Sequence, residues 1–316
     1  MDIKDFSYDL TLSAVDKGML SEIADIHGDI SGAFNIRKNG EGLVRTSSKN
    51  VEIIAKKDKP GIDIIVKPFT KGEEVHIPVI LTESGKKDLV YNDFYIGEGA
   101  DVDIIAGCGI HNCGNADSQH DGIHTFHVGK NAVLRYVEKH YGEGDGTGKR
   151  ILNPETVVFQ EEGSYVEMET VQIKGVSSTH RKTEATLGDN AKILILEKLM
   201  THGDQYAKSD MVVNLDGVDS SAQIISRTVG KDTSKQVFFP NAVGNNKCRA
   251  HVQCDSIIMD DAKISSIPAI SANHPDAQIV HEAAIGKINS DQLLKLQTFG
   301  LSDEEAEEVI IQGFLK

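Results

Sequence analysis

Two stretches, Val128-Gly-Lys-Asn-Ala-Val-Leu134 and Leu187-Gly-Asp-Asn-Ala-Lys-Ile193, share a pattern that indicates the fold. In each, an apolar residue leads into a turn that contains Gly and Asn, a small residue follows, and an alternating strand begins. Gly and Asn tolerate the positive φ angles that tight turns need. Such a turn followed by a strand, repeated along a chain, is typical of an all-β protein.

The same pattern recurs at Ile96-Gly-Glu-Gly-Ala-Asp-Val102 and, more weakly, at 162–166, 220–224 and 259–264. The small residues of the first five copies fall at positions 100, 132, 164, 191 and 222, and the sixth is Ala262 after a longer step. An interval of about 30 residues is characteristic of repeat proteins, so we predict a parallel β-helix whose coils share one core. An antiparallel β-sandwich is the competing interpretation, because regular short strands suit it too.

Three regions are expected along the chain. Residues 1–45 are mixed and polar, with a short helix predicted around Ser13–Ala24. Residues 46–288 are predicted to form the β-helix, and residues 289–316 a helical segment. Within the β region, β-branched or alternating runs between polar turns predict strands. These runs lie at 51–55, 62–66, 75–81, 102–106 and 133–137.

The last segment predicts two helices. The first covers Ser290–Phe299 and is followed by Gly300, a suitable C-cap residue. Ser302-Asp-Glu-Glu305 is a capping box that opens the second helix, with Ala306, Val309 and Ile310 on one stripe. Gly313 is expected to end this helix. Two short amphipathic helices either cap a solenoid or present a face to another protein.

Composition restricts the classes of partner. The formal net charge is −15, and no basic run occurs, which argues against nucleic acid and anionic membranes as partners. Residues 1–6 contain no apolar stretch like a signal peptide, and no segment approaches the roughly 20 apolar residues of a membrane span. We therefore expect a cytoplasmic protein whose four cysteines are reduced.

Motifs for catalysis are lacking. Gly144-Asp-Gly-Thr-Gly-Lys-Arg150 resembles a phosphate-binding loop, but Glu143 replaces its first Gly and Arg150 its Ser or Thr. We expect that this chain binds no nucleotide, and that any ATP is hydrolysed by another chain. The sequence has no Gly-x-Ser-x-Gly elbow and no obvious carboxylate pair, so no enzyme activity is predicted.

Two regions concentrate side chains that bind metals. The first offers a candidate metal site, because thiolate and imidazole ligands suit zinc, iron or a cluster. Its candidate ligands are Cys108, His111, Cys113, His120 and His124. The spacing matches no standard zinc module. A hydrogen-bonded polar surface loop is the alternative interpretation.

The second region contains Cys254, His281 and Glu282. Strand alternation places Cys254 with apolar neighbours, and likewise His281, whereas Glu282 faces the opposite way. Lys247 and Arg249 flank the Cys254 strand and could favour a thiolate, and two solvated surface charges are the alternative interpretation. A buried His needs a hydrogen-bond partner or a metal.

The C-terminal quarter resembles one known family. Residues 248–256, 274–288, 300–306 and 310–314 are similar to the C-terminal core of the SufB/SufD iron–sulfur cluster assembly scaffolds. The resemblance implies a right-handed parallel β-helix and a complex with a SufC-like ABC-type ATPase. In that complex sulfur and iron combine into a transient cluster.

The resemblance also assigns residue roles. Cys254 aligns with the family's cluster-associated cysteine, which makes the chain more similar to SufB than to SufD, and His281 and Glu282 align with its partners. The closing helices would dock the ATPase through Leu293, Leu296, Phe299, Val309 and Ile310. Val280 departs from a frequent Glu, and the Cys108–His127 region lies outside the recognised pattern.

The resemblance implies a short prokaryotic form. Such a chain is expected to pair with itself or with a second SufB/SufD-type subunit, and to receive sulfur from a cysteine desulfurase or sulfur carrier. A SufD-like subunit that holds no cluster is the first alternative. A metal-dependent β-helix enzyme that uses residues 111–127 is the second.

Overall fold

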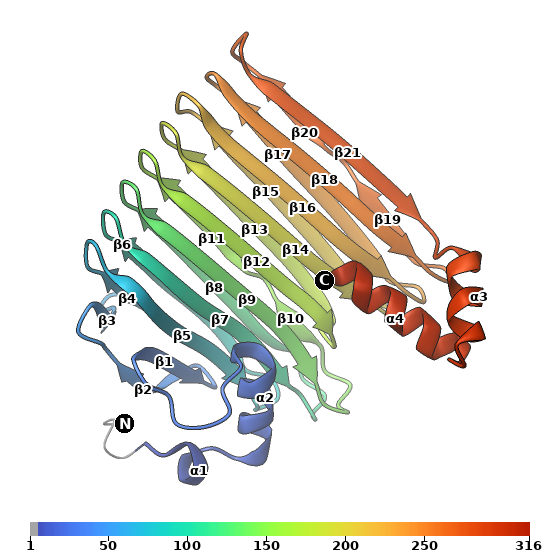
Figure 1. Ribbon diagram of the computed structural model, residues 1–316. Helices are drawn as coiled ribbons and strands as arrows, with labels where there is room; N and C mark the ends of the chain where they lie inside the picture. Colours follow the sequence, from blue (N-terminus) through green and yellow to red (C-terminus); the bar gives the residue numbers. More distant parts are fainter. Residues whose placement is uncertain (1–5) are drawn as a thin grey trace.

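The computed structural model describes residues 6–316, which wind into a β-solenoid of about eight turns (Figure 1). Two sheets face each other, and a chain of parallel pairings runs through each sheet from coil to coil. Among the described residues, only the pairs β1–β2 and β3–β4, near the N-terminal end, are antiparallel. The predicted parallel β-helix is therefore confirmed, and the antiparallel sandwich is excluded.

Sheet A has ten strands, in the order β2-β1-β5-β7-β9-β12-β14-β16-β18-β21. Their bounds in chain order are β1 Ala33–Lys38, β2 Glu41–Thr46, β5 Lys71–Leu81, β7 Asp101–His111, β9 Val133–Glu143, β12 Tyr165–Lys174, β14 Lys192–Thr201, β16 Ser220–Gly230, β18 Cys248–Ile258 and β21 Gln278–Gly286. Sheet B contains β3 Val51–Ala55, β4 Gly61–Val66, β6 Lys87–Ile96, β8 Ser118–Val128, β10 Arg150–Leu152, β11 Glu155–Gln160, β13 Ser178–Leu187, β15 Tyr206–Leu215, β17 Lys235–Gly244, β19 Lys263–Ser266 and β20 Ala269–Ala272.

The predicted turn pattern builds one corner between the sheets. Its small residue is buried in each coil, and in six of the seven coils the residue before it adopts a left-handed conformation, as at Asn131 (φ 54°) and Asn190 (φ 58°). The backbone N–H that follows each corner residue donates to the carbonyl of the corner one coil earlier. The stacked corners are Thr70, Ala100, Ala132, Ser164, Ala191, Ser220 and Cys248.

Two predicted corner positions are wrong. The fifth corner is Ser220 instead of position 222, because the N–H of Ser221 donates to Ala191, and Ser220 pairs with Cys248 in the next coil. Ala262 belongs to the opposite corner, where the N–H of Lys263 donates to Ser234. Cys248, 2% exposed, thus has a packing role as a small corner residue.

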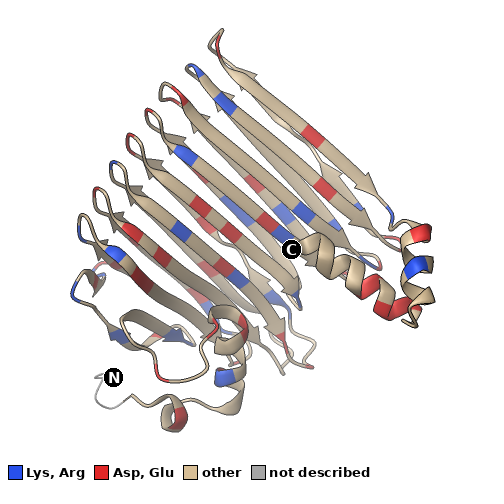
Figure 2. Cartoon of the chain, in the orientation of Figure 1, with Lys and Arg blue, Asp and Glu red and all other residues tan. Residues whose placement is uncertain are grey.

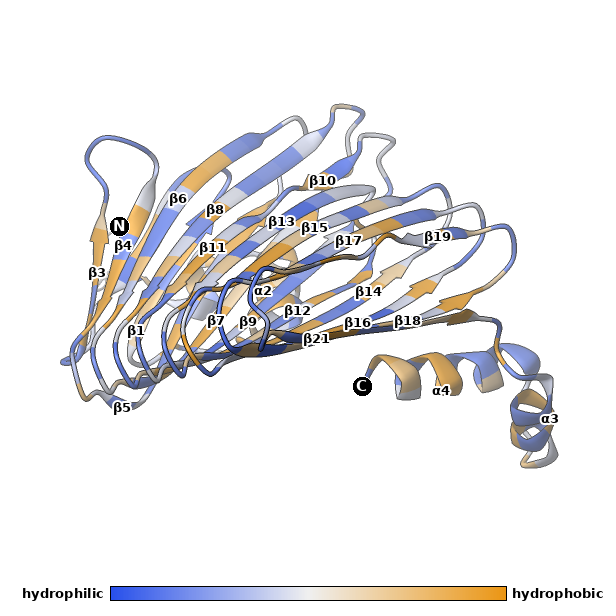
Figure 3. Cartoon of the chain, turned by 90° about the horizontal axis from the view of Figure 1, so that it is seen from above, coloured by the Kyte–Doolittle hydropathy of each residue, from blue (hydrophilic) through white to orange (hydrophobic). Residues whose placement is uncertain are grey.

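Hydrophilic and hydrophobic residues follow one another along the strands (Figure 3), and every second side chain points into the interior. Near the corner the inward residues are apolar, but further along sheet A they become polar. The register between neighbouring coils aligns the inward residues of this part of sheet A in two rows. The Glu138 row contains Glu138, Thr170, Glu197, Ser226 and Cys254, and the Cys108 row contains Cys108, His140, Gln172, Leu199, Thr228 and Ser256.

Helices flank both ends of the solenoid. The N-terminal region holds α1 (Tyr8–Thr11) and α2 (Ala14–Ala24), and the predicted helix is confirmed with Ser13 as its N-cap. The C-terminal helices are α3 (Ser290–Thr298) and α4 (Asp303–Leu315), and the Ser302 capping box is present. Within residues 6–316, none of the helices combines the length and apolar character that crossing a membrane requires.

Helix α4 differs from its prediction in two respects. It continues past Gly313 to Leu315, because Ile311 and Leu315 are both buried beside Val229 of β16. The buried stripe is therefore Ala306, Ile311 and Leu315, while Val309 is 50% exposed.

Replacement of a corner residue by a larger one should destabilise the stack. Ala132 is fully buried between equivalent corners, so Ala132→Leu should lower the free energy of unfolding by about 1–3 kcal/mol through overpacking. Ala284→Leu, at an exposed position of β21, is the matched control and should change it little. Urea denaturation measures both. Equal stability of the two variants would show that the corner is not a packing constraint.

Candidate functional site

Cys254 and His281 meet inside the last coils. Cys254 lies on β18 and is 2% exposed, and His281 lies on the neighbouring strand β21. The sheet pairs Val252 with His281 and Cys254 with Ala283, so the two side chains contact each other diagonally on the same face. The distance from Cys254 Sγ to His281 Nε2 is 3.4 Å. A thiol and an imidazole at this separation can share one metal ion.

A small cavity with both polar and apolar lining residues borders the thiol. It measures about 10 Å³, and its lining includes Glu197, Ser226, Cys254, Ser256 and Ser266. That volume holds about one water-sized atom. On the other side, β21 is the last strand of sheet A, so His281 is only partly covered. The centre is therefore enclosed toward the interior and more open toward the end of the solenoid.

Electrostatics keep this centre neutral. Burial raises the pKa of the Cys254 thiol, and the Glu197 carboxylate adds to the rise. Burial also lowers the pKa of His281, with help from His251. The expectation that Lys247 and Arg249 favour a thiolate is wrong, because Lys247 pairs with Asp219 at 2.8 Å and Arg249 lies exposed on the outer face. A metal ion must displace the thiol proton.

Glu282 lies outside this centre. Its side chain is 65% exposed, and its Oε2 lies 3.5 Å from His251 Nε2 on the outer face. Alternation along β21 separates it from His281, as the sequence predicts. The structure thus brings together two of the three predicted cluster residues.

The five predicted metal ligands near residue 108 occupy three separate places. At the surface, Cys113 is exposed and its Sγ lies 3.0 Å from His111 Nε2, while His111 Nδ1 lies 2.9 Å from Glu143 Oε1. The two ring nitrogens of His111 therefore contact two different residues, Glu143 and Cys113. No three of the predicted five, all within the described chain, form a group of converging ligand atoms.

His120 and His124 are buried on β8, so residues 118–128 form a strand and not the alternative polar surface loop. His120 Nδ1 lies 3.1 Å from Asp88 Oδ2, and His124 Nδ1 lies 2.8 Å from the Tyr136 hydroxyl. Burial lowers the pKa of His124 to about 4. Both imidazoles therefore belong to the polar interior.

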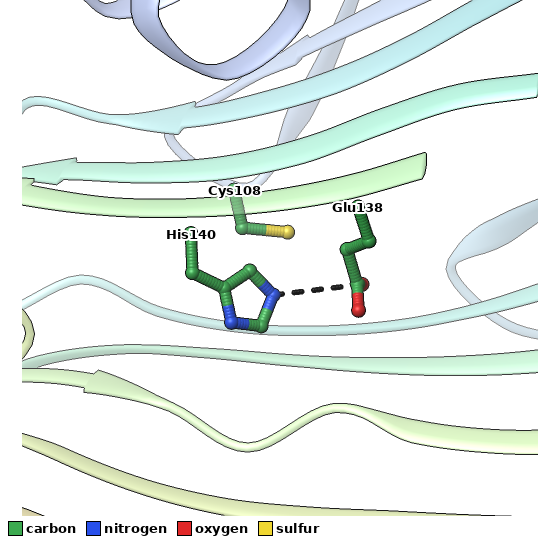
Figure 4. Close-up of side chains that lie close together, drawn as sticks. All are labelled: Cys108, Glu138 and His140. Carbon is green, nitrogen blue, oxygen red and sulfur yellow. Dashed lines mark ion pairs between the residues drawn. The ribbon is translucent and has the colours of Figure 1, made fainter. Parts of the chain in front are cut away.

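Cys108 has partners that the sequence analysis missed. Its Sγ and one ligand atom each of Glu138 and His140 lie within 4.8 Å of one another, and all three residues are buried (Figure 4). Glu138 and His140 lie on the same inner face of β9 as Leu134 and Tyr136. Extension of the predicted strand 133–137 by a few residues would have revealed two polar side chains on its inner face.

The Gly144–Gly148 run has a packing role. A Cβ atom on Gly144 would lie 2.4 Å from the carbonyl oxygen of Asn112, and one on Gly148 would lie 2.1 Å from that of Ala116. Glycine is thus required here because the backbone of the preceding coil lies directly against these residues.

Comparison with protein-family models matches residues 83–314 to the core domain described as "SUF system FeS cluster assembly, SufBD core domain". The chain belongs to the SufBD family. The matched range begins just before β6 and includes α3 and α4. It therefore contains both the Cys254–His281 centre and the Cys108 group of this SufBD chain.

Two curated relatives support this family assignment. An iron–sulfur cluster assembly SufBD family protein of Archaeoglobus fulgidus is 30% identical over 256 residues, which cover 78% of this chain and 66% of the relative. A second relative of the same description, from Pyrococcus horikoshii, is 26% identical over 288 residues, 90% of this chain and 85% of its own. This SufBD chain is accordingly an iron–sulfur cluster assembly protein of that family.

Thiol accessibility tests the placement of the cysteines. Cys113 is the only exposed thiol of the four, all of which are described, while Cys108, Cys248 and Cys254 are buried. Native protein should therefore react rapidly at one thiol per chain with a small disulfide reagent, and at four after unfolding. Cys113→Ser should abolish the rapid phase. Rapid labelling that persists in this variant would contradict the buried positions.

Proposed function

We propose that this SufBD chain is a scaffold that holds an iron–sulfur intermediate between Cys254 and His281. The contact of 3.4 Å between the thiol and the imidazole is the observation that carries the proposal. Thiolate and imidazole are natural ligands for iron and for nascent clusters. The family membership supports an assembly role, and the geometry supports this pair as the ligands.

The remaining ligands come from outside the enclosed interior. The cavity beside Cys254 holds about one atom, so a complete cluster grows toward the end of the solenoid, where His281 is partly exposed. Strand β21 ends sheet A there, and Val280 (52% exposed) and Ile285 (44%) present apolar surface. An unpaired strand edge is a template for another strand. A second copy of this chain, or a second SufB/SufD-type subunit, would cover this edge and complete the ligand set.

The C-terminal helices are the proposed dock for a SufC-like ATPase. Ile311 and Leu315 anchor α4 on the solenoid, which leaves Phe299 (73% exposed) and Val309 (50%) facing outward. Leu293, Leu296 and Ile310 are half-buried beside them. Figure 2 shows acidic residues along α4, and its sequence between 303 and 315 has no basic residue. An ATPase surface that combines apolar and basic groups would fit this pair of helices.

A SufD-like subunit without a cluster is the second candidate. The raised pKa of Cys254 favours it, since a protonated thiol accepts neither iron nor sulfur readily. The outward position of Glu282 favours it as well. Such a subunit would bind the ATPase and a second scaffold but take up no iron. A cysteine desulfurase or sulfur carrier would then serve the other scaffold.

Anaerobic reconstitution with iron and sulfide separates the two candidates. The parent chain should acquire iron and acid-labile sulfide, and Cys254→Ser should lose most of both because the only thiolate of the centre is removed. Cys113→Ser should match the parent. A full cluster complement in Cys254→Ser would remove this residue from the site, and a parent that never takes up iron would favour the SufD-like candidate.

Iron uptake should rise with pH. Burial raises the Cys254 pKa and lowers that of His281, so near neutral pH the ion displaces one proton, from the thiol. Affinity should increase by about tenfold per pH unit until the pH passes the raised pKa of the thiol. Ferrous-ion titrations at several pH values measure this slope. Affinity independent of pH would mean that the thiol is not a ligand.

The helical dock is tested by co-expression with the neighbouring ATPase. Phe299→Asp combined with Val309→Asp should lower the amount of ATPase that co-purifies by at least about tenfold, since several kcal/mol of apolar contact would be lost. Phe159→Asp, at an exposed position of sheet B far from the helices in sequence, is the control. Unchanged co-purification of the helix variant would place the dock elsewhere.

A further inference from the structure

A second group of metal-binding side chains lies inside the coils, away from Cys254. Cys108 lies on β7, and Glu138 and His140 lie on the adjacent strand β9. Glu138 and Cys254 belong to the same row, four coil steps apart, which is about 19 Å at the usual strand spacing. The two groups are therefore separate sites.

The geometry of the Cys108 group fits a metal ion better than a hydrogen bond. His140 Nε2 and Glu138 Oε1 are 3.5 Å apart. This separation is long for a hydrogen bond. It is close to the edge of about 3.4 Å that joins two ligands in a tetrahedral site with bonds of about 2.1 Å. Cys108 Sγ completes a triangle in which all three ligand atoms lie within 4.8 Å of one another.

The charges of this interior also favour a cation. Two buried carboxylates, Glu138 and Glu197, face one buried guanidinium, that of Arg181, which donates to Glu138 at 2.7 Å and lies 3.9 Å from Glu197. The group therefore carries one uncompensated negative charge. A divalent ion that displaces the proton of Cys108 adds one net positive charge. The interior then becomes neutral, as a buried site requires.

The surrounding residues fix the ligands. Of the two Glu138 carboxylate oxygens, Arg181 Nη1 donates to Oε2, which leaves Oε1 facing His140. Gln172 is in register with His140, and its buried Oε1 has no hydrogen-bond partner. Arg181 Nη2 lies 3.3 Å from His140 Nδ1 and can only donate, so without a metal the ring proton is on Nε2, which faces Glu138 Oε1. Metal binding at Nε2 requires this proton to move to Nδ1, where Gln172 Oε1 can accept it. Metal-bound histidines typically donate their other ring N–H to an acceptor of this kind.

We propose that Cys108, Glu138 and His140 bind a divalent transition metal ion, zinc or iron(II), inside the solenoid. One thiolate, one imidazole and one carboxylate suit these ions, and a fourth position stays open for water or sulfide. The His111–Cys113 pair at the surface cannot serve in this way, because Glu143 and Cys113 occupy opposite nitrogens of His111. Since the three ligand residues are buried, the ion enters during folding or local opening and exchanges slowly.

Cobalt(II) is the probe for this site. The full chain is refolded anaerobically with Co²⁺ and passed over a chelator, and metal content and near-ultraviolet absorption are measured. We expect one retained ion per chain with a thiolate-to-cobalt charge-transfer band. Cys108→Ser should lose the band and His140→Gln the retained ion, while circular dichroism stays that of the parent.

Two control variants distinguish this site from the others. Cys113→Ser should keep the ion and the band. Cys254→Ser should keep them too, because the two-ligand Cys254–His281 centre gives up cobalt to the chelator, so a failure of the proposed cluster site leaves this result unchanged. The proposal is overturned if the parent retains no cobalt, if the band persists in Cys108→Ser, or if it disappears in Cys254→Ser. Should Cys108→Ser not fold, retention of the ion by folded His140→Gln would also overturn it.

Discussion

In-register parallel pairing between coils is the constraint on which the rest of this molecule depends. The residue after each corner donates its backbone N–H to the carbonyl of the corner one coil earlier, and this fixes the register of the strand that follows. An inward residue therefore lies against the inward residue of the next coil. Side chains about 30 positions apart in sequence become direct neighbours, and polar ones gather into rows. The Cys254–His281 contact and the Cys108 group are both products of this stacking.

Burial determines what these groups can do. A surface thiol such as Cys113 meets its partners without desolvation, but Cys108 and Cys254 are held in their protonated forms because burial raises the pKa of each. Glu138 behaves in the opposite way: although burial opposes its ionisation, His140 and Arg181 keep its pKa well below the usual range. In the proposed sites, a bound ion would replace the thiol proton and neutralise the neighbouring carboxylate.

Local patterns in the sequence predicted most of the architecture. Strand 51–55 and the helix capped by Ser13 have the expected bounds, because β-branched runs and capping residues act over a few positions. Alternation also placed Cys254 inward and Glu282 outward. The corner at position 222 was wrong by two residues, since Ser220 and Ala222 are both small and only hydrogen bonds to the previous coil distinguish them. Glu138 and His140 escaped prediction because their proximity to Cys108 depends on register between strands some 30 residues apart.

The central claim, that Cys254 and His281 jointly hold iron, predicts a nitrogen ligand at the metal. The most direct measurement is pulsed electron paramagnetic resonance of the reduced, reconstituted protein, which detects hyperfine coupling between the iron spin and a coordinated imidazole nitrogen. The account predicts such a coupling in the parent chain and its loss in His281→Ala. A paramagnetic cluster with no nitrogen coupling, or one whose coupling survives in His281→Ala, would contradict it.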